Sequence, residues 1–247
     1  MFQTQNFQIF EEKNYDMLSL RAAKYICRLI KENPEAVIIC ATGSTPTRMY
    51  ADLARLVEEE RVDCSKVTIV KLDEWVGLLP SDPSTCEFYI KQHVLEPLGI
   101  PESNYISFQS NTPDPQNECE RIDTILHNLG NEPDLCILGL GANGHLGMNE
   151  PGTDPESHTH VATLTSQTRA HTMLSGNTQT VTRGMTLGIQ DILQTKTAML
   201  LVSGAQKKAQ FERFMRKEDG SNFPASYLWD HKNVSCFVDE EAYHTSS

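Results

Sequence analysis

The chain has 247 residues, of which 39% are hydrophobic and 22% charged, with a formal net charge of −12. This balance excludes a disordered chain and is typical of a globular protein that can bury a sizeable core. The acidic charge argues against nucleic acid as a partner, because binding to a phosphate backbone needs a positive footprint. No apolar run reaches the length of a membrane span, and residues 1–14 are too polar for a signal peptide, so we expect a cytoplasmic protein with no membrane partner.

In chain order, the sequence predicts a helix over 15–31 and then short apolar runs that alternate with helical patterns. The runs are continuous and rich in β-branched residues, which is typical of strands buried on both faces. Strands are expected at 36–40, 67–70, 135–138, 197–202 and 234–238. Further helices are expected at 49–57, at 84–94, where Ser84 to Glu87 form a capping box, and at 205–216.

The alternation of strands and helices predicts a mainly parallel sheet flanked by helices, in a Rossmann-like three-layer α/β fold. No long linker or repeat divides the sequence, so residues 1–247 are expected to form a single domain. Seven scattered cysteines without a C-x-x-C pair argue for a reducing compartment rather than a disulfide framework. Cys40, Cys136 and Cys236 lie in predicted strands and are expected in the core.

Four polar clusters each follow a predicted strand, and ligands of open α/β sheets bind at the carboxyl ends of the strands. In the first cluster, 41–46, Gly43 permits a tight turn, Thr45 is expected to cap the next helix, and Pro46 suits its first turn. The free amides around Ser44, with the helix dipole, would seat a phosphate. An ordinary capped strand–helix turn explains the same residues equally well.

The second and fourth clusters place charged side chains at strand ends. In 71–75, Asp73 could act as a general base near an apolar wall, whereas a solvated acidic turn is the simpler interpretation of this segment alone. In 203–207, Lys207 could bind a phosphate as a point charge, although a lone lysine on a helix is more often a surface residue. Both interpretations therefore depend on the neighbouring clusters.

The third cluster, 139–152, contains a G-x-G-x-x-G pattern after a strand. We reject a dinucleotide site, because 147–152 is too rich in glycine and proline to begin the helix that this motif needs. What remains is a glycine-lined loop that presents Asn143, His145 and Glu150. A histidine oriented by a carboxylate is a natural proton shuttle near neutral pH, and we favour this interpretation over a purely structural histidine.

Other kinds of active site are not predicted. His145, His158 and His160 form no His-Glu-x-x-His pattern, so we expect no metal. No Gly-x-Ser-x-Gly elbow is present, so a nucleophilic serine triad is not expected. Residues 151–159 are expected to form a loop beside the site rather than a domain boundary.

Three motifs together are very specific: Ala-Thr-Gly-Ser-Thr-Pro at 41–46, Leu-Asp-Glu-Trp at 72–75 and Gly-Ala-Asn-Gly-His-Leu-Gly-Met-Asn-Glu-Pro at 141–151. Through them the chain, from about residue 14 to residue 238, resembles the glucosamine-6-phosphate deaminases and galactosamine-6-phosphate deaminase/isomerases. This family is related to the 6-phosphogluconolactonases. The ending Asn-Glu-Pro-Gly at 149–152 favours the deaminase branch, because the lactonases resemble this loop only as far as the histidine.

The resemblance implies an enzyme that isomerises a hexosamine 6-phosphate and releases ammonia with water, which we also class as a hydrolase. It implies that Asp73 is the base that moves a proton between carbon 2 and carbon 1, that His145 opens the sugar ring, and that Glu150 is the carboxylate partner of His145. Asn143 stands where many relatives carry Asp, so Glu150 is expected to supply more of the orientation. No cofactor is implied, because no redox change occurs.

The resemblance also implies phosphate contacts from the loop of Gly43, Ser44 and Thr45 and from Lys207. In the family, a second arginine often follows the Thr-Arg pair, which is Thr168-Arg169 here. At the corresponding later position this sequence has Leu174. We take Arg183 as its substitute.

Several details favour the galactosamine branch, which makes tagatose 6-phosphate from galactosamine 6-phosphate. Trp75 replaces the tyrosine usual in glucosamine enzymes, and the segments 85–87, 181–184 and 224–229 look like galactosamine-6-phosphate isomerase. A glucosamine-6-phosphate deaminase that gives fructose 6-phosphate is the alternative. More distant alternatives are a 6-phosphogluconolactonase and a non-catalytic sugar-phosphate sensor. The expected partner is a small sugar phosphate, and a homo-oligomer is left open.

Overall fold

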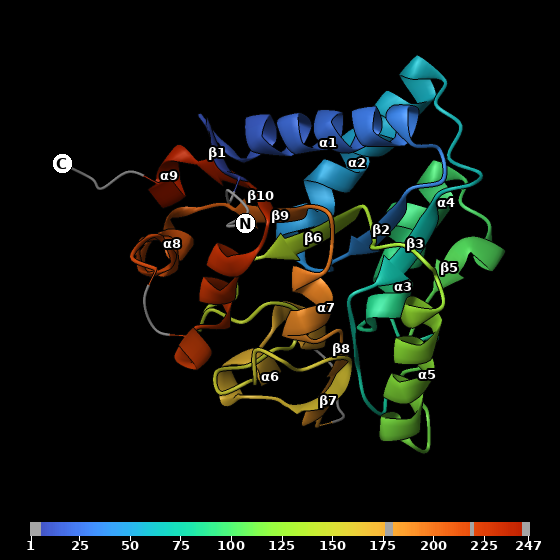
Figure 1. The fold of residues 1–247 in the computed structure, drawn as a ribbon, viewed down its shortest axis with the longest axis vertical. Coiled ribbons are helices and arrows are strands. Elements are labelled where there is room, and N and C mark those ends of the chain that lie inside the picture. The colour runs from blue at the N-terminus through green and yellow to red at the C-terminus, as the bar shows by residue number, and fades with distance from the viewer. Residues whose placement is uncertain (1–5, 176–179, 218–219, 244–247) are drawn as a thin grey trace.

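The computed structural model describes residues 6–175, 180–217 and 220–243 as an α/β structure around a seven-stranded sheet (Figure 1). The strand order is β1-β10-β9-β6-β2-β3-β5, and every neighbouring pair is parallel. The strands are β1 (Asn6–Glu12), β2 (Val37–Cys40), β3 (Thr68–Lys71), β5 (Tyr105–Ile106), β6 (Leu135–Gly139), β9 (Ala198–Val202) and β10 (Asn233–Asp239). The expected mainly parallel sheet flanked by helices is confirmed, and all five predicted strands belong to it.

Two strands of this sheet and a second sheet were not predicted. The edge strand β1 alternates polar and apolar residues, and β5 has only two residues, so neither forms a continuous apolar run. The second sheet is antiparallel, in the order β4 (Asp73–Trp75), β8 (Arg183–Thr186), β7 (His160–Thr163). Its strands have three or four residues each, too few to show a period.

Helices cover both faces of the main sheet (Figure 1). One face packs against α1 (Tyr15–Glu32), α2 (Ser44–Glu60), α3 (Cys86–Ile90) and α4 (Glu96–Leu98), and the other against α5 (Pro115–His127), α7 (Ile189–Leu193), α8 (Lys208–Met215) and α9 (Glu240–Tyr243). A short α6 (Ser166–Arg169) lies near the second sheet. Successive strand residues face opposite layers, so both faces of each central strand are apolar.

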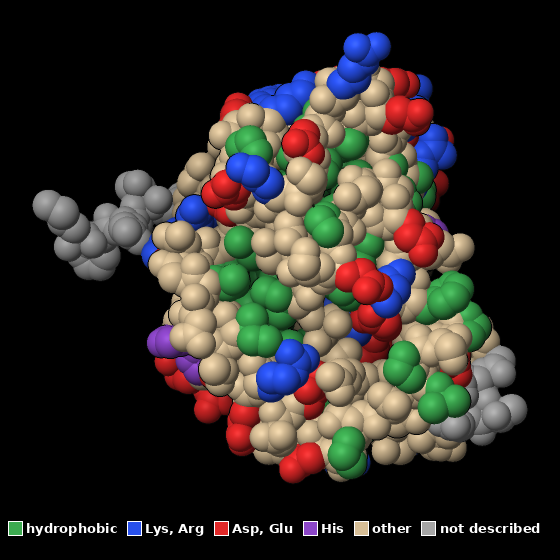
Figure 2. Space-filling view, turned by 90° about the vertical axis from the view of Figure 1, so that its right-hand side faces the viewer, with side chains coloured by type: hydrophobic (Ala, Val, Ile, Leu, Met, Phe, Trp, Pro, Cys, Tyr) green, Lys and Arg blue, Asp and Glu red, His purple; other side chains and the backbone are tan. Residues whose placement is uncertain are grey.

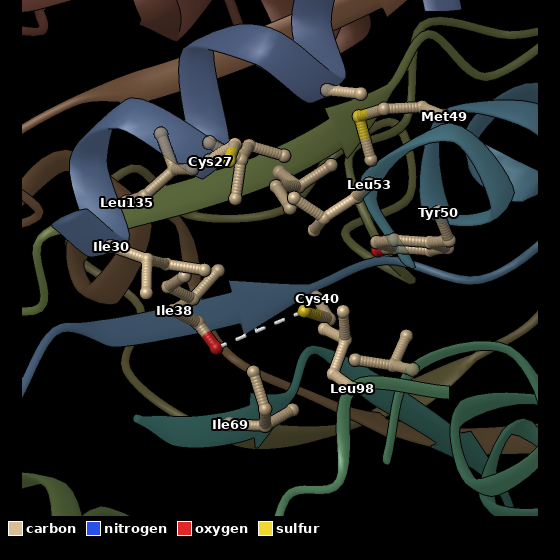
Figure 3. Close-up of a cluster of buried hydrophobic side chains, with 14 of the residues drawn as sticks. Cys27, Ile30, Ile38, Cys40, Met49, Tyr50, Leu53, Ile69, Leu98 and Leu135 are labelled. Atoms are coloured by element: carbon tan, nitrogen blue, oxygen red, sulfur yellow. Dashed lines mark hydrogen bonds between the residues drawn. The ribbon is translucent and has the colours of Figure 1, made fainter. Parts of the chain in front are cut away.

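Strand β2 illustrates this packing. Ile38 and Cys40 belong to the cluster with α1 and α2, whereas Ile39 belongs to the cluster on the opposite face. Figure 3 shows Cys27 of α1 and Leu53 of α2 on the first of these faces. The prediction that Cys40, Cys136 and Cys236 lie in the core is confirmed, and all seven cysteines are buried free thiols.

The structure corrects two helix starts. Thr85, not Ser84, caps α3 and accepts a hydrogen bond from the Phe88 amide, while the Glu87 side chain binds Lys71 instead of returning to the cap. Beyond α3 the helix continues as a π-helical turn, Lys91–Leu95. The predicted helix over 205–216 begins with a 3₁₀ turn, Ala205–Lys207, before α8.

On the face shown in Figure 2, Lys and Arg side chains are interspersed with Asp and Glu side chains. None of the helices in the described ranges is both long and apolar enough to cross a membrane.

Candidate active site

A cleft of about 200 Å³ lies at the carboxyl ends of the strands of the main sheet. Drug-sized ligands occupy sites of roughly 300–1,000 Å³, so this cleft suits a small ligand. All four polar clusters contribute to it, as the sequence predicted from their positions after strands. The lining residues are Ala41, Thr42, Gly43, Ser44, Thr45, Pro46, Leu72, Asp73, Trp75, Cys86, Gly139, Leu140, Gly141, Ala142, His145, Gly147, Met148, Gln167, Thr168, His171, Gln206 and Lys207.

The first cluster opens the long helix α2. Gly43 has a φ of 102°, which favours glycine, and it is the residue before the helix. Thr45 lies inside the first turn and does not cap the helix, which corrects the prediction, whereas Pro46 does occupy the first turn. No side chain of the described residues caps this end, so amides of the first turn point at the cleft with the positive end of the helix dipole.

Lys207 brings a cationic side chain to the same cleft. Its Nζ atom donates to the carbonyl of Leu140 at 2.7 Å, and no carboxylate among the described residues forms an ion pair with it. Burial lowers the pKa of the Lys207 ammonium. An anion beside Lys207 would therefore meet a charge that the protein leaves uncompensated.

Asp73 lies at the start of β4, opposite Thr186 of β8. Burial, followed by the charge of Glu74, raises the pKa of the Asp73 carboxyl to about 7. The Cys86 thiol lies 3.6 Å from its Oδ1 atom and donates to it, which opposes that rise. A buried carboxylate with a pKa close to neutral is suited to both accept and return a proton.

The neighbouring Glu74 points away from the cleft into a buried ion pair. Its Oε2 atom lies 2.7 Å from Lys71 Nζ, and the same carboxylate accepts from the Cys86 and Glu87 amides at the start of α3. Lys71 also binds the Glu87 carboxylate at 2.8 Å. This network was not predicted, because a charged cluster at the end of a strand is usually solvated. It holds α3 against β4 and thereby places Cys86 beside Asp73.

The glycine-rich loop aligns three predicted residues in a hydrogen-bonded chain. The Nδ2 atom of Asn143 donates to Glu150 at 2.7 Å, and its Oδ1 atom lies 2.7 Å from His145 Nδ1. Glu150 therefore acts on the histidine through Asn143, which corrects the expectation of a direct partner. The Glu150 carboxylate is itself held by the amide and hydroxyl of Thr165.

This series of hydrogen bonds determines which nitrogen of the His145 imidazole carries the proton. The Asn143 oxygen accepts, so His145 donates through Nδ1 and its Nε2 atom keeps a free lone pair. Burial lowers the pKa of His145 to about 4, against the pull of Glu150. His145 is therefore a neutral proton acceptor at neutral pH. A Cβ atom on Gly141 would lie 2.4 Å from the ring, so only glycine admits the histidine here.

No helix begins at the third glycine of the G-x-G-x-x-G pattern, as expected. Residues 151–159 form a loop, as predicted, but this loop does not line the cleft. Arg183, at the start of β8, is exposed and also lies outside the lining, so the structure does not bring it to the other residues that were expected to bind phosphate.

Four lining residues, Cys86, Gln167, Thr168 and His171, lie outside the four predicted clusters. Thr168 follows no strand of the main sheet and lies in α6, with its hydroxyl 3.4 Å from His145 Nδ1. His171 comes from the segment after α6, and no periodicity or spacing connects it to the clusters. Only the three-dimensional approach of this segment to Gly43 identifies it.

Outside the cleft, one group among the described residues has the composition of a metal site. Ligand atoms of Asp123, His158 and Asp191 lie within 4.8 Å of one another. Asp191 already accepts from the Gly188 amide at the start of α7, from Thr159 and from His158, which accounts for its position. None of the three lines the cleft.

Comparisons with known proteins agree on one family. A family model described as "Glucosamine-6-phosphate isomerases/6-phosphogluconolactonase" matches residues 11–237. The Escherichia coli (strain K12) protein named "Putative deaminase AgaI" is 43% identical over 92% of this chain and 89% of its own. "Glucosamine-6-phosphate deaminase 1" of Bacillus subtilis (strain 168) is 37% identical over 95% of this chain and 98% of its own.

Solved structures show the same fold. A structure described as a monomeric glucosamine-6-phosphate deaminase has a TM-score of 0.89 and 35% identity, and the match covers 96% of this chain and 98% of the other. A 6-phosphogluconolactonase from Trypanosoma brucei has a TM-score of 0.74 over 97% and 98% of the two chains. Its identity is 20%, so this second likeness concerns the fold alone.

Proposed function

Because the chain belongs to the family of glucosamine-6-phosphate isomerases and 6-phosphogluconolactonases, we propose that it isomerises and deaminates a hexosamine 6-phosphate. One observation carries the proposal. Asp73 and the chain of Glu150, Asn143 and His145 supply two different proton carriers to one cleft, which also has an uncapped helix start for a phosphate. Ring opening and aldose–ketose isomerisation each need one such carrier.

In the first step the sugar ring opens. The free Nε2 atom of His145 takes the proton of the hydroxyl at carbon 1 and returns it to the ring oxygen, so the imidazole ends neutral. Asn143 accepts from the Nδ1–H throughout, and Glu150 holds Asn143 in the orientation that allows this. The step therefore depends on a histidine that is unprotonated at neutral pH, in keeping with its low pKa.

In the second step Asp73 takes the proton from carbon 2, which gives an enolamine. Return of the proton to carbon 1 gives a ketose iminium ion, and water adds to carbon 2 while ammonia leaves. The nitrogen is thus released by hydrolysis of a C=N bond, and carbon 1 is reduced as carbon 2 is oxidised. A base with a pKa of about 7 serves both transfers, because neither protonation state is strongly favoured at neutral pH.

We propose galactosamine 6-phosphate as the substrate and tagatose 6-phosphate as the product. Trp75 and Cys86 support this choice, since both line the cleft and both belong to the segments that resemble the galactosamine branch. Glucosamine 6-phosphate is the second candidate, because the names of the Bacillus subtilis relative and of the monomeric structural relative specify it.

The test is ammonia release by the purified full chain from galactosamine 6-phosphate and, separately, from glucosamine 6-phosphate. We expect release from both substrates or from one, with a higher kcat/KM for the galactosamine compound. Asp73→Asn is the matched control, because its side chain has the same size and cannot act as a base. Faster release from glucosamine 6-phosphate would reverse the choice of epimer, and no release from either would refute a deaminase.

A further inference from the structure

His171 lies at the phosphate end of the proposed substrate cleft, although no motif of the sequence contains it. A Cβ atom built on Gly43 would lie 3.7 Å from its Nε2 atom and 3.8 Å from its Cε1 atom. The Nε2 edge of the ring therefore faces the loop that opens α2. The ring also lies 6.1 Å from the Trp75 ring, centroid to centroid, at an interplanar angle of 45°.

A backbone contact determines which nitrogen of His171 carries the proton. The Nδ1 atom accepts a hydrogen bond from the Met173 amide at 3.2 Å, as the cap of the turn Thr172–Leu174. An accepting Nδ1 requires that the neutral ring carry its hydrogen on Nε2. The nitrogen that faces Gly43 is therefore a donor. His145 has the opposite tautomer, with its hydrogen on Nδ1.

Within the described part of the chain, the charge that acts most on His171 is the positive charge of Lys207. Burial, and after it the charge of Lys207, lowers the pKa of His171, and burial lowers the pKa of Lys207. Two groups that prefer an anion thus lie near an uncapped helix start. Arg183, the residue expected to complete the phosphate contacts, lies outside the cleft lining.

We infer that His171 is a phosphate-binding residue, which donates a hydrogen bond from Nε2–H to the phosphate group of the substrate seated at the start of α2. This inference rests on the proposed function for the identity of the substrate. It does not require turnover, because orthophosphate alone would occupy the same seat. His171 takes the place that Arg183 was expected to fill, with a neutral donor instead of a guanidinium.

Two substitutions separate this role from the capping role. His171→Asn places an amide oxygen where Nδ1 accepts from the Met173 amide, so the turn keeps its cap but loses the donor at the cleft. His171→Gln places its amide nitrogen near the position of Nε2, so the donor is kept and the cap is weakened. A purely structural role would make the Gln variant the worse of the two.

The experiment measures orthophosphate binding by isothermal titration calorimetry and steady-state kinetics with both hexosamine 6-phosphates, on the full chain. For His171→Asn we expect orthophosphate affinity to fall by roughly tenfold or more, as for the loss of a hydrogen bond to a charged group, and KM to rise similarly with kcat nearly unchanged. His171→Gln should stay within about threefold of the unmodified protein.

Two outcomes would overturn the inference. Unchanged orthophosphate affinity in His171→Asn would show that Nε2 makes no phosphate contact. Equal losses in both variants would show that the effect follows the fold of the 172–174 turn rather than the donor. Failure of the proposed function is a separate result, because a protein that releases no ammonia can still bind orthophosphate in a way that depends on His171.

Discussion

The Nδ1 atom of His145 lies 2.7 Å from the Oδ1 atom of Asn143, and this contact leaves the other imidazole nitrogen of this cleft-lining residue free to accept a proton. The amide nitrogen of Asn143 donates to Glu150, so its amide oxygen is the atom that faces His145 and accepts the hydrogen bond. An asparagine thus does in this cleft what a carboxylate does beside many catalytic histidines, without placing a charge on the ring. The negative charge of Glu150 is one side chain further away.

Replacing Asn143 by Leu should therefore impair catalysis more than binding. The variant keeps the size of the side chain but removes both the acceptor for His145 and the donor for Glu150. We expect kcat to fall by about 100-fold or more, since a general acid–base group contributes roughly 10²–10⁴-fold and needs its orientation. Steady-state kinetics of ammonia release would measure this effect.

Asn143→Asp is the matched control for that variant. Its carboxylate still accepts from His145 but faces Glu150 at close range, so we expect an intermediate loss that lessens when the pH is lowered and one carboxyl takes a proton. If the Leu and Asp variants had equal kcat values, the hydrogen bonds of Asn143 would have no part in orienting the histidine.

The rate of the reaction should rise with pH through the titration of Asp73. Burial raises the pKa of this carboxyl to about 7, and only its ionised form can accept the carbon-bound proton. We expect kcat/KM to increase from pH 5 to pH 8 with a midpoint near 7. A midpoint near pH 4, the ordinary value for aspartate, would show that Asp73 is not buried as described or is not the base.

The raised pKa of the Asp73 carboxyl also predicts that Asp73→Asn stabilises the fold at neutral pH. A raised folded-state pKa means that the folded chain keeps a proton which the unfolded chain loses above about pH 4. Stability is then fully present below pH 4 and declines as the pH rises toward 7. The variant lacks this decline, so we expect its free energy of unfolding at pH 8 to exceed that of the unmodified chain by up to about 4 kcal/mol.

Urea denaturation at pH 4 and pH 8 measures this difference. The two proteins should differ far less at pH 4 than at pH 8. An Asn variant that is less stable than the unmodified chain at both pH values would contradict the prediction.

The Cys86 thiol should tune the base that it contacts. It donates to Asp73 Oδ1 at 3.6 Å and thereby lowers the pKa of the carboxyl. Cys86→Ala removes this donor, so the midpoint of the pH–rate profile should move upward by less than about one pH unit. Cys86→Ser supplies a stronger donor of similar size and should move the midpoint downward. Equal midpoints in all three proteins would refute the contact.

The buried pair of Lys71 and Glu74 should be essential to stability. Lys71→Met leaves the Glu74 carboxylate buried without its cation, and removal of one partner of a buried pair costs about 3–5 kcal/mol. Denaturation in urea would report this loss. The double variant Lys71→Met with Glu74→Gln removes both charges while the amide oxygen can still accept from the Cys86 amide, so it should regain part of the stability. A single variant as stable as the unmodified chain would show that the pair is solvated.

The main sheet was predictable because its central strands are apolar on both faces. Ile38 and Ile39 face different helix layers, and a run that is apolar on both faces stands out in the sequence. The edge strand β1 pairs on one side only and exposes alternate residues, so its sequence resembles a polar segment. Strands of the second sheet are too short for any period to appear.

The candidate site was predictable where its residues follow strands, and only there. Asp73 and Lys207 belong to segments that follow β3 and β9, and the shared edge of a parallel sheet brings these segments to one cleft. His171 follows no strand of the main sheet, so its position depends on how α6 packs beside the glycine-rich loop. Thr45 was taken for the cap because threonine is a good cap in isolation, whereas the cap position is Gly43, two residues earlier, and the helix begins at Ser44.

Strand β4 has only three residues, and they alternate in direction. Asp73 and Trp75 line the cleft, while Glu74 between them reaches Lys71 and the amides of α3 on the opposite side. The proposed base, Asp73, and the residue that anchors α3, Glu74, are thus adjacent in the sequence, and the alternation of side chains along the strand places them on opposite sides. Deleting one residue just before Asp73 would move Glu74 to the position that faces the cleft and Trp75 to the position that faces Lys71, so that α3 would lose the carboxylate that holds it. The length of this segment is therefore as strictly constrained as the identity of its two carboxylates.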